Sequence, residues 1–216
     1  RSEGNVVCSG SALREDQIAA CGYGRVMFRT PSDNRSPGPP TRIVVAGGGF
    51  GGAYVVRHFE RLCRHRNDVD IVLVSRDNFF LMTPLLFEAC SGALNFRHCA
   101  VPLRAFLASA RFIEATVRHI DLERHVVHAV ASEGAEYELP YDQLVLALGS
   151  VTNRERIPGS DQAFTFKTLA DAAVLRNHVI ERFERADEEA DPARKRKLLT
   201  FVVIGGGLVG VDLLGE

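Results

Sequence analysis

The 216-residue sequence lacks several features that mark whole classes of protein. Basic and acidic residues are balanced, 26 against 27, so charge gives no indication of nucleic-acid binding. No apolar run approaches the roughly 18 residues of a membrane-spanning helix, and the N-terminal residues contain no apolar core typical of a signal peptide. With 46% hydrophobic and 25% charged residues, the composition is typical of an ordinary soluble globular protein.

Paired cysteines are missing as well. The cysteines are odd in number and none has C-x-x-C spacing: Cys8, Cys21, Cys63, Cys90 and Cys99. This spacing supports neither a zinc site nor a thioredoxin-like redox pair, and we predict no metal site. We expect single thiols that pack as small hydrophobic side chains in a reducing compartment.

The N-terminal residues differ from the rest of the chain. Residues 1–40 have no sustained periodicity and end in a stretch rich in proline, glycine and small polar residues. Such a stretch cannot continue a helix or a central strand, so we predict a disordered leader or linker over 1–40. Beyond it, β-branched apolar runs at 42–46 and 70–74 predict buried parallel strands. Helical spacing at 55–63 predicts a helix between them, which completes one βαβ unit.

Downstream, the periodicity predicts short helices, antiparallel strands and two more buried strands. In chain order these are helices near 85–90 and 102–110, antiparallel strands at 112–120, 126–130 and 137–139, and buried strands at 144–148 and 198–204. Between the last two strands, Thr168 and Asp171 have capping-box spacing ahead of a helix that reaches residue 183. The pattern predicts an α/β fold.

Glycine, with 19 residues, is concentrated in two clusters. In the first, Gly47, Gly49 and Gly52 fit G-x-G-x-x-G between a strand and a helix. The first glycine permits a tight turn, the second lets backbone approach a pyrophosphate, and the third lets the helix pack closely on the strand. The helix N-terminus then offers free N–H groups and partial positive charge to phosphates. The motif in this context predicts a dinucleotide site.

One contact of that site is irregular. The acid that usually ends the second strand and binds a ribose hydroxyl is replaced by Ser75. A serine hydroxyl forms a weaker hydrogen bond with ribose than a carboxylate does. Asp77, two residues further on, is a second candidate for this contact.

The second cluster repeats the motif far downstream, with Gly205, Gly207 and Gly210 behind an apolar run. Two such units so far apart cannot belong to one mononucleotide half, so they predict two nucleotides, a flavin and the nicotinamide that reduces it. The chain ends at Glu216, whereas a βαβ unit needs roughly thirty residues. Either the sequence is truncated or a partner completes the unit, and we expect truncation as the simpler case.

Several segments in this order resemble the type II NADH dehydrogenases (NADH:quinone oxidoreductases) of the pyridine nucleotide-disulfide oxidoreductase superfamily, over the N-terminal half of such a protein. The segments are RIVVAGGGFGG at 42–52, SRDNFFLMTPLLFEACSGAL at 75–94, YDQLVLALGSVTN at 141–153, IPG at 157–159, FKTLADA at 166–172 and VVIGGGLVGVDLLGE at 202–216. The resemblance implies a Rossmann-like FAD-binding domain at 41–159, a parallel sheet with an antiparallel β insertion. It also implies the start of a second Rossmann-like, NAD-binding domain at 160–216.

The resemblance further implies which residues bind FAD and NADH. For FAD these are Gly47, Gly49, Phe50, Gly51 and Gly52 at the pyrophosphate, Ser75 and Arg76 near the adenosine ribose, Thr83, Pro84 and Leu85 in the loop approaching the flavin, Val117 with its backbone at the adenine, and Ala147, Leu148 and Gly149 in a second FAD fingerprint. For NADH they are Gly205, Gly207 and Gly210.

Asp212 is the candidate catalytic residue. It falls where the resembled family usually has a glutamate, close to where nicotinamide meets flavin. The alternative is that Asp212 merely occupies the first turn of a helix, where negative charge is favourable.

The activity implied by the resemblance is hydride transfer from NADH to FAD, with electrons passed on to a quinone. The implied location is the cytoplasm, or the cytoplasmic face of the inner membrane, with membrane contact through residues beyond Glu216. The resemblance also makes a homodimer a candidate assembly. Two alternatives remain open: another FAD/NAD(P)-dependent reductase of the superfamily, or a non-catalytic nucleotide-binding fragment.

Overall fold

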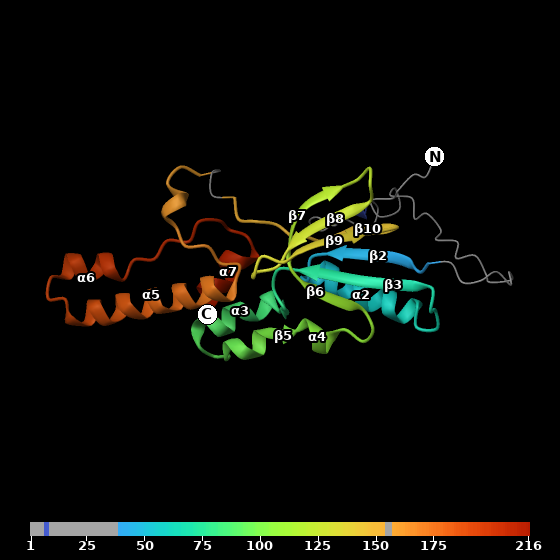
Figure 1. Cartoon of the computed structure of the whole chain (residues 1–216). Coiled ribbons are helices and arrows are strands. Elements are labelled where there is room, and N and C mark those ends of the chain that lie inside the picture. The colour runs from blue at the N-terminus through green and yellow to red at the C-terminus, as the bar shows by residue number, and fades with distance from the viewer. Residues whose placement is uncertain (1–6, 9–38, 154–156) are drawn as a thin grey trace, which may run out of the picture. The chain divides into compact units, whose positions relative to one another are not determined.

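A computed structural model of the chain describes residues 7–8, 39–153 and 157–216 (Figure 1). The chain divides into two compact units. The first comprises Arg1–Phe80 and Pro102–Gly149, and the second comprises Leu81–Val101 and Ser150–Glu216. Apart from residues 7–8 and 39–40, the leader expected at 1–40 lies outside the described residues. The domain boundary expected at 159 stays a prediction.

The first unit contains a sheet of parallel strands. Their spatial order is β1 (Val7–Cys8), β10 (Gln143–Leu146), β2 (Thr41–Ala46), β3 (Val69–Ser75) and β6 (Arg111–Glu114). Because every neighbouring pair is parallel, the carboxyl ends of these strands lie along one edge of the sheet. Helix α2 (Phe50–Leu62) connects β2 to β3 and packs against both. This arrangement confirms the βαβ unit predicted from the sequence.

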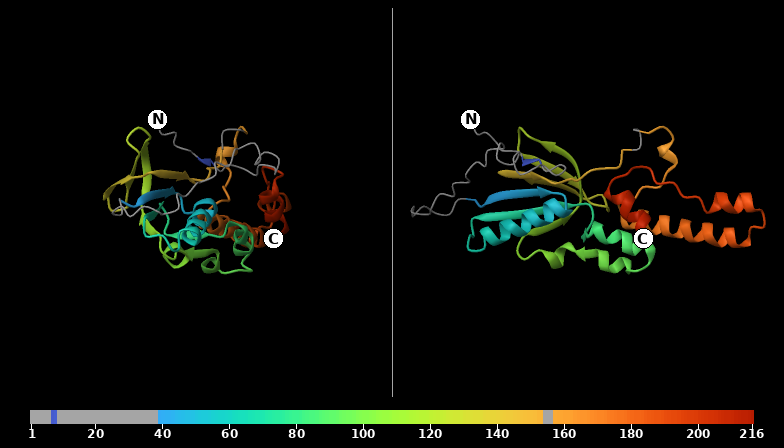
Figure 2. Two further views of the ribbon diagram at one scale, coloured as in Figure 1. Left: turned by 90° about the vertical axis from the view of Figure 1, so that its right-hand side faces the viewer. Right: turned by 180° about the vertical axis from the view of Figure 1, so that it is seen from behind.

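An antiparallel sheet packs on the parallel one within the same unit (Figures 1 and 2). Its strands are β7 (Thr116–Asp121), β8 (Val126–Val130) and β9 (Glu136–Pro140). Branched side chains of the parallel sheet, such as Val72 and Val74, meet Val127 and Leu139 in a common core. Burying the strands on both faces requires long apolar runs, which explains why the run at 42–46 lacks alternation.

The predicted antiparallel strand at 112–120 is wrong as a single element. Residues Arg111–Glu114 form β6, which pairs in parallel with β3, and only the following residues belong to the antiparallel β7. The chain changes sheets at Ala115, whose N–H still donates to the carbonyl oxygen of Ser75 at 2.9 Å. Both strands bury apolar side chains, so hydrophobic alternation continues through the crossing and hides it.

The second unit is mostly helical. Its elements are η1 (Thr83–Leu85), α3 (Leu86–Ser91), η2 (Phe96–Cys99), η3 (Ser160–Gln162), α5 (Leu169–Glu188), α6 (Pro192–Leu198) and α7 (Leu208–Gly215). The capping box is confirmed, since Asp171 N–H donates to the Thr168 hydroxyl oxygen while the Asp171 carboxylate accepts from Thr168 N–H. Helix α3 packs against α5, where the Cys90 thiol donates to the carbonyl oxygen of Ala172 at 3.6 Å.

Three short elements complete the chain. Helix α4 (Leu103–Phe106) belongs to the first unit, where the predicted helix at 102–110 proves shorter than expected. Strands β4 (Phe79–Leu81) and β5 (Ala100–Pro102) form a separate two-stranded sheet. In the described part of the chain, no helix is both long and apolar enough to cross a membrane.

The predicted buried strand at 198–204 is also wrong. Helix α6 extends to Leu198, and the Thr200 hydroxyl closes its end by donating to the carbonyl oxygen of Arg196 at 2.6 Å. The residues that follow pair with no strand in the described ranges, and Val202 is 80% exposed. A β-strand needs a hydrogen-bonded neighbour, so apolar β-branched sequence alone does not form one here.

Candidate functional site

The first glycine turn connects β2 to α2 at the carboxyl edge of the parallel sheet (Figure 1). Gly47 has a φ of +110°, and a Cβ atom built on it would collide with the carbonyl oxygen of Ala147. A Cβ atom on Gly52 would collide with the carbonyl oxygen of Gly47. These two glycines therefore permit the tight turn and the close packing of helix on strand.

The middle glycine of the motif faces open space. Gly49 is the N-cap of α2, with φ −75° and ψ −165°, and no heavy atom lies within 4 Å of a Cβ built on it. Within the described residues, no side chain caps this helix and its first turn contains no acid. The first N–H groups of α2 are therefore free to bind a phosphate at the positive end of the helix. This turn fits the pyrophosphate of a dinucleotide such as FAD.

Phe50 and Gly51 begin α2 and are exposed beside the turn. The Phe50 ring packs edge-on against Phe80, with 4.8 Å between ring centroids, and stacks on Tyr54 at 6.5 Å. Phe50 is thus held in place by aromatic neighbours while 40% of its surface stays accessible.

The two candidates for the ribose contact differ in their surroundings. Ser75 ends β3, and a Cβ atom built on Gly48 would lie 2.7 Å from the Ser75 Oγ atom, so this hydroxyl packs against the glycine turn. Arg76 is exposed and forms an ion pair with Asp77 at 3.0 Å. The hydrogen bond that Arg76 donates to the Asp77 carboxylate raises the pKa of Arg76. The Asp77 carboxylate is therefore already engaged in an ion pair with Arg76.

The remaining first-unit candidates lie in β7 and directly after β10. Val117 lies in β7 next to a β-bulge and is partly buried against the core. Ala147 follows β10, and its N–H donates to the carbonyl oxygen of Ala46 at 2.8 Å. Leu148 is 60% exposed, and Gly149 has a φ of +74°. The structure brings Ala147 against the glycine turn, and the part of these residues in binding FAD stays a prediction.

In the second unit, Thr83, Pro84 and Leu85 form the single turn of η1 ahead of α3. The buried Cys99 thiol donates to the carbonyl oxygen of Leu85 at 3.4 Å, and this hydrogen bond stabilises the turn. Burial raises the pKa of the Cys99 thiol, and the nearby Glu88 carboxylate raises it further. A buried thiol with a raised pKa is a packing group rather than a nucleophile.

The second glycine turn repeats the backbone conformation of the first. Gly205 has a φ of +111°, and Gly207 is the N-cap of α7 with φ −77° and ψ 172°. A Cβ atom on Gly210 would lie 2.5 Å from the carbonyl oxygen of Gly205, whereas one on Gly207 would meet nothing within 4 Å. Gly210 and Gly207 thus repeat the close packing of Gly52 and the open position of Gly49, whereas Gly205 shares the positive φ of Gly47 but has nothing within 4 Å of an added Cβ atom.

Asp212 is exposed on α7. The first turn of this helix contains no acidic residue, so Asp212 lies beyond it. The alternative reading of Asp212 as a first-turn residue is therefore wrong, because the helix begins at Leu208 rather than closer to Asp212.

Two acidic residues of the first unit were not predicted from the sequence. Glu60 is only 7% exposed on α2, and its Oε1 atom accepts from the backbone N–H groups of Ala108, Ser109 and Ala110 at 2.6–2.8 Å. Glu60 lies four residues after the buried Val56, and this helical spacing predicts that Glu60 shares the apolar face of the helix. Glu114 ends β6, and only the strand register reveals its relation to Ser75.

A parallel sheet whose glycine turn opens a helix at its carboxyl edge defines the first unit as a Rossmann-type dinucleotide-binding domain. The family model described as "Pyridine nucleotide-disulphide oxidoreductase" matches residues 41–215. The chain belongs to this family.

Relatives within the family include type II NADH dehydrogenases. The type II NADH:quinone oxidoreductase Ndh of Mycobacterium tuberculosis is 34% identical over 87% of this chain and 40% of its own length. The mitochondrial external alternative NADH-ubiquinone oxidoreductase of Yarrowia lipolytica is 30% identical over 90% of this chain and 35% of its own length. The solved structure of NDH2 from Plasmodium falciparum in complex with NADH has a TM-score of 0.68 at 27% identity, covering 80% of this chain and 36% of that one. The chain thus spans well under half the length of these relatives.

Proposed function

We propose that this chain supplies the FAD-binding segment and part of the NADH-binding segment of a type II NADH:quinone oxidoreductase. The observation that carries the proposal is the pair of glycine turns with one backbone conformation, with φ +110° at Gly47 and +111° at Gly205. Each turn opens a helix whose N-terminus can bind a pyrophosphate. Two such turns in one chain suit an enzyme that brings two dinucleotides to one reaction.

The roles of the individual residues follow from this assignment. Gly47 and Gly52 shape the first turn, and the N–H groups that follow Gly49 bind the FAD pyrophosphate. Gly207 has the corresponding place for NADH in the second turn. When bound, FAD would supply the redox chemistry, by taking a hydride from NADH and passing its electrons to a quinone.

Asp212 is proposed to act near the nicotinamide, as its place in the family pattern implies. It is exposed on α7 and follows the open Gly207 in the same turn-and-helix element. The carboxylate is therefore accessible to a ligand bound at the N-terminus of α7. A shorter side chain than glutamate would reach less far, which Asp212→Glu tests by the affinity for NADH.

The proposal is tested by adding NADH to the FAD-loaded chain without oxygen and recording the visible flavin absorption. We expect the absorption to bleach and to return when a water-soluble quinone is added. Gly207→Ala should bind FAD normally and fail to respond to NADH, because its methyl group would enter the open space above the second turn. A chain that binds FAD but shows neither NADH binding nor bleaching, at any NADH concentration, would contradict the assignment.

The setting of the whole protein is proposed with its activity. A quinone acceptor dissolved in the bilayer would place the enzyme on a membrane surface, at the cytoplasmic face of the inner membrane, and the family resemblance also favours a homodimer. One of the relatives is named as a mitochondrial enzyme. Cell fractionation followed by flotation with liposomes tests the location, and light scattering on the whole protein tests the dimer.

A further inference from the structure

The first dinucleotide site lacks the carboxylate that usually receives the adenosine ribose. In Rossmann-type sites an acid at the end of the second strand accepts a hydrogen bond from the ribose 2′-hydroxyl. Here that position is Ser75, whose Cβ and Oγ atoms lie 2.8 and 2.7 Å from a Cβ built on Gly48. The short side chain is thus packed against the turn. The end of β3 therefore offers the ribose a hydroxyl and no carboxylate.

Glu114 is the acid nearest to that position in the strand register. It ends β6 directly opposite Ser75 in the parallel pairing of β3 with β6. Neighbouring strands lie about 4.8 Å apart, and residues paired across them point to the same face of the sheet. A glutamate carries its carboxylate on two methylene groups. Its side chain can therefore reach across that spacing to the site of the missing acid.

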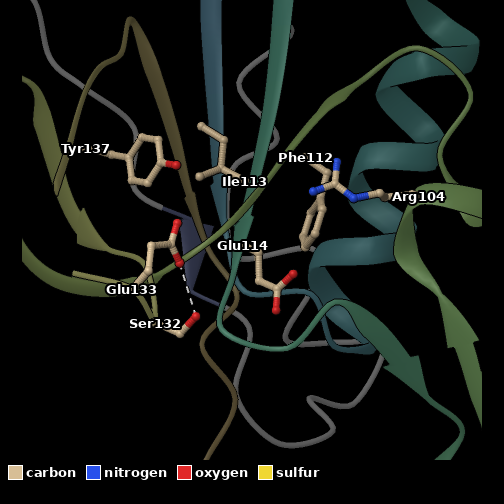
Figure 3. A pocket seen from close by; sticks show the side chains of 7 residues that line it. All are labelled: Arg104, Phe112, Ile113, Glu114, Ser132, Glu133 and Tyr137. Atoms are coloured by element: carbon tan, nitrogen blue, oxygen red, sulfur yellow. Dashed lines mark hydrogen bonds between the residues drawn. The ribbon is translucent and has the colours of Figure 1, made fainter. Parts of the chain in front are cut away.

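The Glu114 carboxylate is available for a ligand. It is exposed, and no hydrogen bond or ion pair joins it to another described residue. It lines a pocket of 290 Å³, in which Figure 3 shows it between Ser132 and Glu133 on one side and Arg104 with Phe112 on the other. Glu133, by contrast, accepts a hydrogen bond from the Ser132 hydroxyl at 3.2 Å.

The pocket also offers a flat polar surface beside Glu114. The Arg104 guanidinium lies over the Phe112 ring, 4.9 Å from its centroid. A guanidinium held on an aromatic ring presents its other face and its N–H groups to a planar or hydroxylated ligand. A free carboxylate and a stacked guanidinium at the carboxyl edge of a parallel sheet are groups that recognise a nucleoside.

We propose that Glu114 accepts a hydrogen bond from the 2′-hydroxyl of the FAD adenosine, in place of the acid that Ser75 replaces. The assignment rests on the proposed function, because it takes FAD as the ligand of the first glycine turn. Glu114 is a binding residue in it and takes no part in hydride transfer. A hydrogen bond to a charged acceptor stabilises a complex by about 1.5–3 kcal/mol, which corresponds to roughly a ten- to hundredfold change in affinity.

The test compares two ligands and two variants of the chain. Dissociation constants of FAD and of its 2′-deoxyadenosine analogue are measured by flavin fluorescence. The wild-type chain should prefer FAD by roughly tenfold or more. Glu114→Gln should lose this preference, because an amide is a weaker acceptor than a carboxylate. Glu133→Gln, which changes the engaged carboxylate of the same pocket, should keep it.

A rescue variant separates ligand recognition from general damage. Ser75→Asp in the Glu114→Gln background should restore the preference for FAD, since it returns an acid to the usual position. If Glu114→Gln discriminates between the two ligands as the wild type does, the assignment of Glu114 is overturned while FAD binding stands. If the wild-type chain binds neither ligand, the proposed function fails and this assignment falls with it.

Discussion

Replacing single glycines of the first turn should separate folding from nucleotide binding. Gly52→Ala would place a Cβ atom into the carbonyl oxygen of Gly47, 2.9 Å from its carbonyl carbon and 3.4 Å from the Cβ atom of Ala147. These neighbours are backbone or rigid side chain and cannot move aside. Overpacking of this kind costs about 1–3 kcal/mol, so we expect Gly52→Ala to lose that much stability in urea unfolding followed by circular dichroism.

Gly49→Ala should behave in the opposite way. Nothing lies within 4 Å of the added methyl group, and the φ of −75° suits alanine. Alanine is a somewhat weaker N-cap than glycine, but it also reduces the entropy of the unfolded chain, which stabilises by about 0.4–1 kcal/mol. The two effects roughly offset each other, and we expect stability within about 0.5 kcal/mol of the wild type.

The same methyl group would occupy the space in which a pyrophosphate approaches the backbone. We expect the dissociation constant of FAD, measured by flavin fluorescence, to rise by about tenfold or more in Gly49→Ala. An unchanged FAD affinity in Gly49→Ala would refute the reasoning, and so would a loss of stability as large as that of Gly52→Ala.

Four further predictions follow from contacts elsewhere in the chain. Glu60→Ala removes the acceptor of three consecutive backbone N–H groups and should cost about 2–4 kcal/mol in urea unfolding; Glu60→Gln, which keeps one carbonyl oxygen, should cost less. Thr168→Ala removes half of a capping box and should cost about 1 kcal/mol by the same measurement. Burial tends to raise the pKa of Asp171, but its hydrogen bonds outweigh burial and hold the pKa below the ordinary 3.8. Its stabilisation is therefore present above that value and lost as pH falls through the lower folded value, so Asp171→Asn and wild type should converge in stability in acid. The exposed apolar run around Val202 should make the isolated chain associate in light scattering, less so in Val202→Lys, and a wild-type chain that stays monomeric at high concentration would contradict this.

Local signals in the sequence were sufficient for the elements that define the first unit. The β-branched runs of β2 and β3 and the glycines between them predicted a βαβ unit. The prediction succeeded because the backbone conformation and packing that require these residues arise within the unit itself. Gly47 is required by a positive φ and Gly52 by the approach of α2 to the turn. The capping box of α5 was predicted for the same reason, since its two hydrogen bonds join residues three positions apart.

Features that depend on distant partners could not be predicted in this way. The crossing at Ala115 is set by which sheet each strand joins, and hydrophobic alternation is the same in both sheets. The run around Val202 has strand-forming residues but no strand beside it in the described part of the chain. The relation of Glu114 to Ser75 depends on a register between strands that are separated by η1, α3, η2 and α4.

The visible absorption spectrum of the chain, taken after incubation with FAD and removal of free ligand, tests the central claim most directly. We expect flavin bands near equimolar with protein in the wild type and their loss in Gly49→Ala. A folded wild-type chain that remains colourless after this treatment would contradict the assignment of the first glycine turn to FAD.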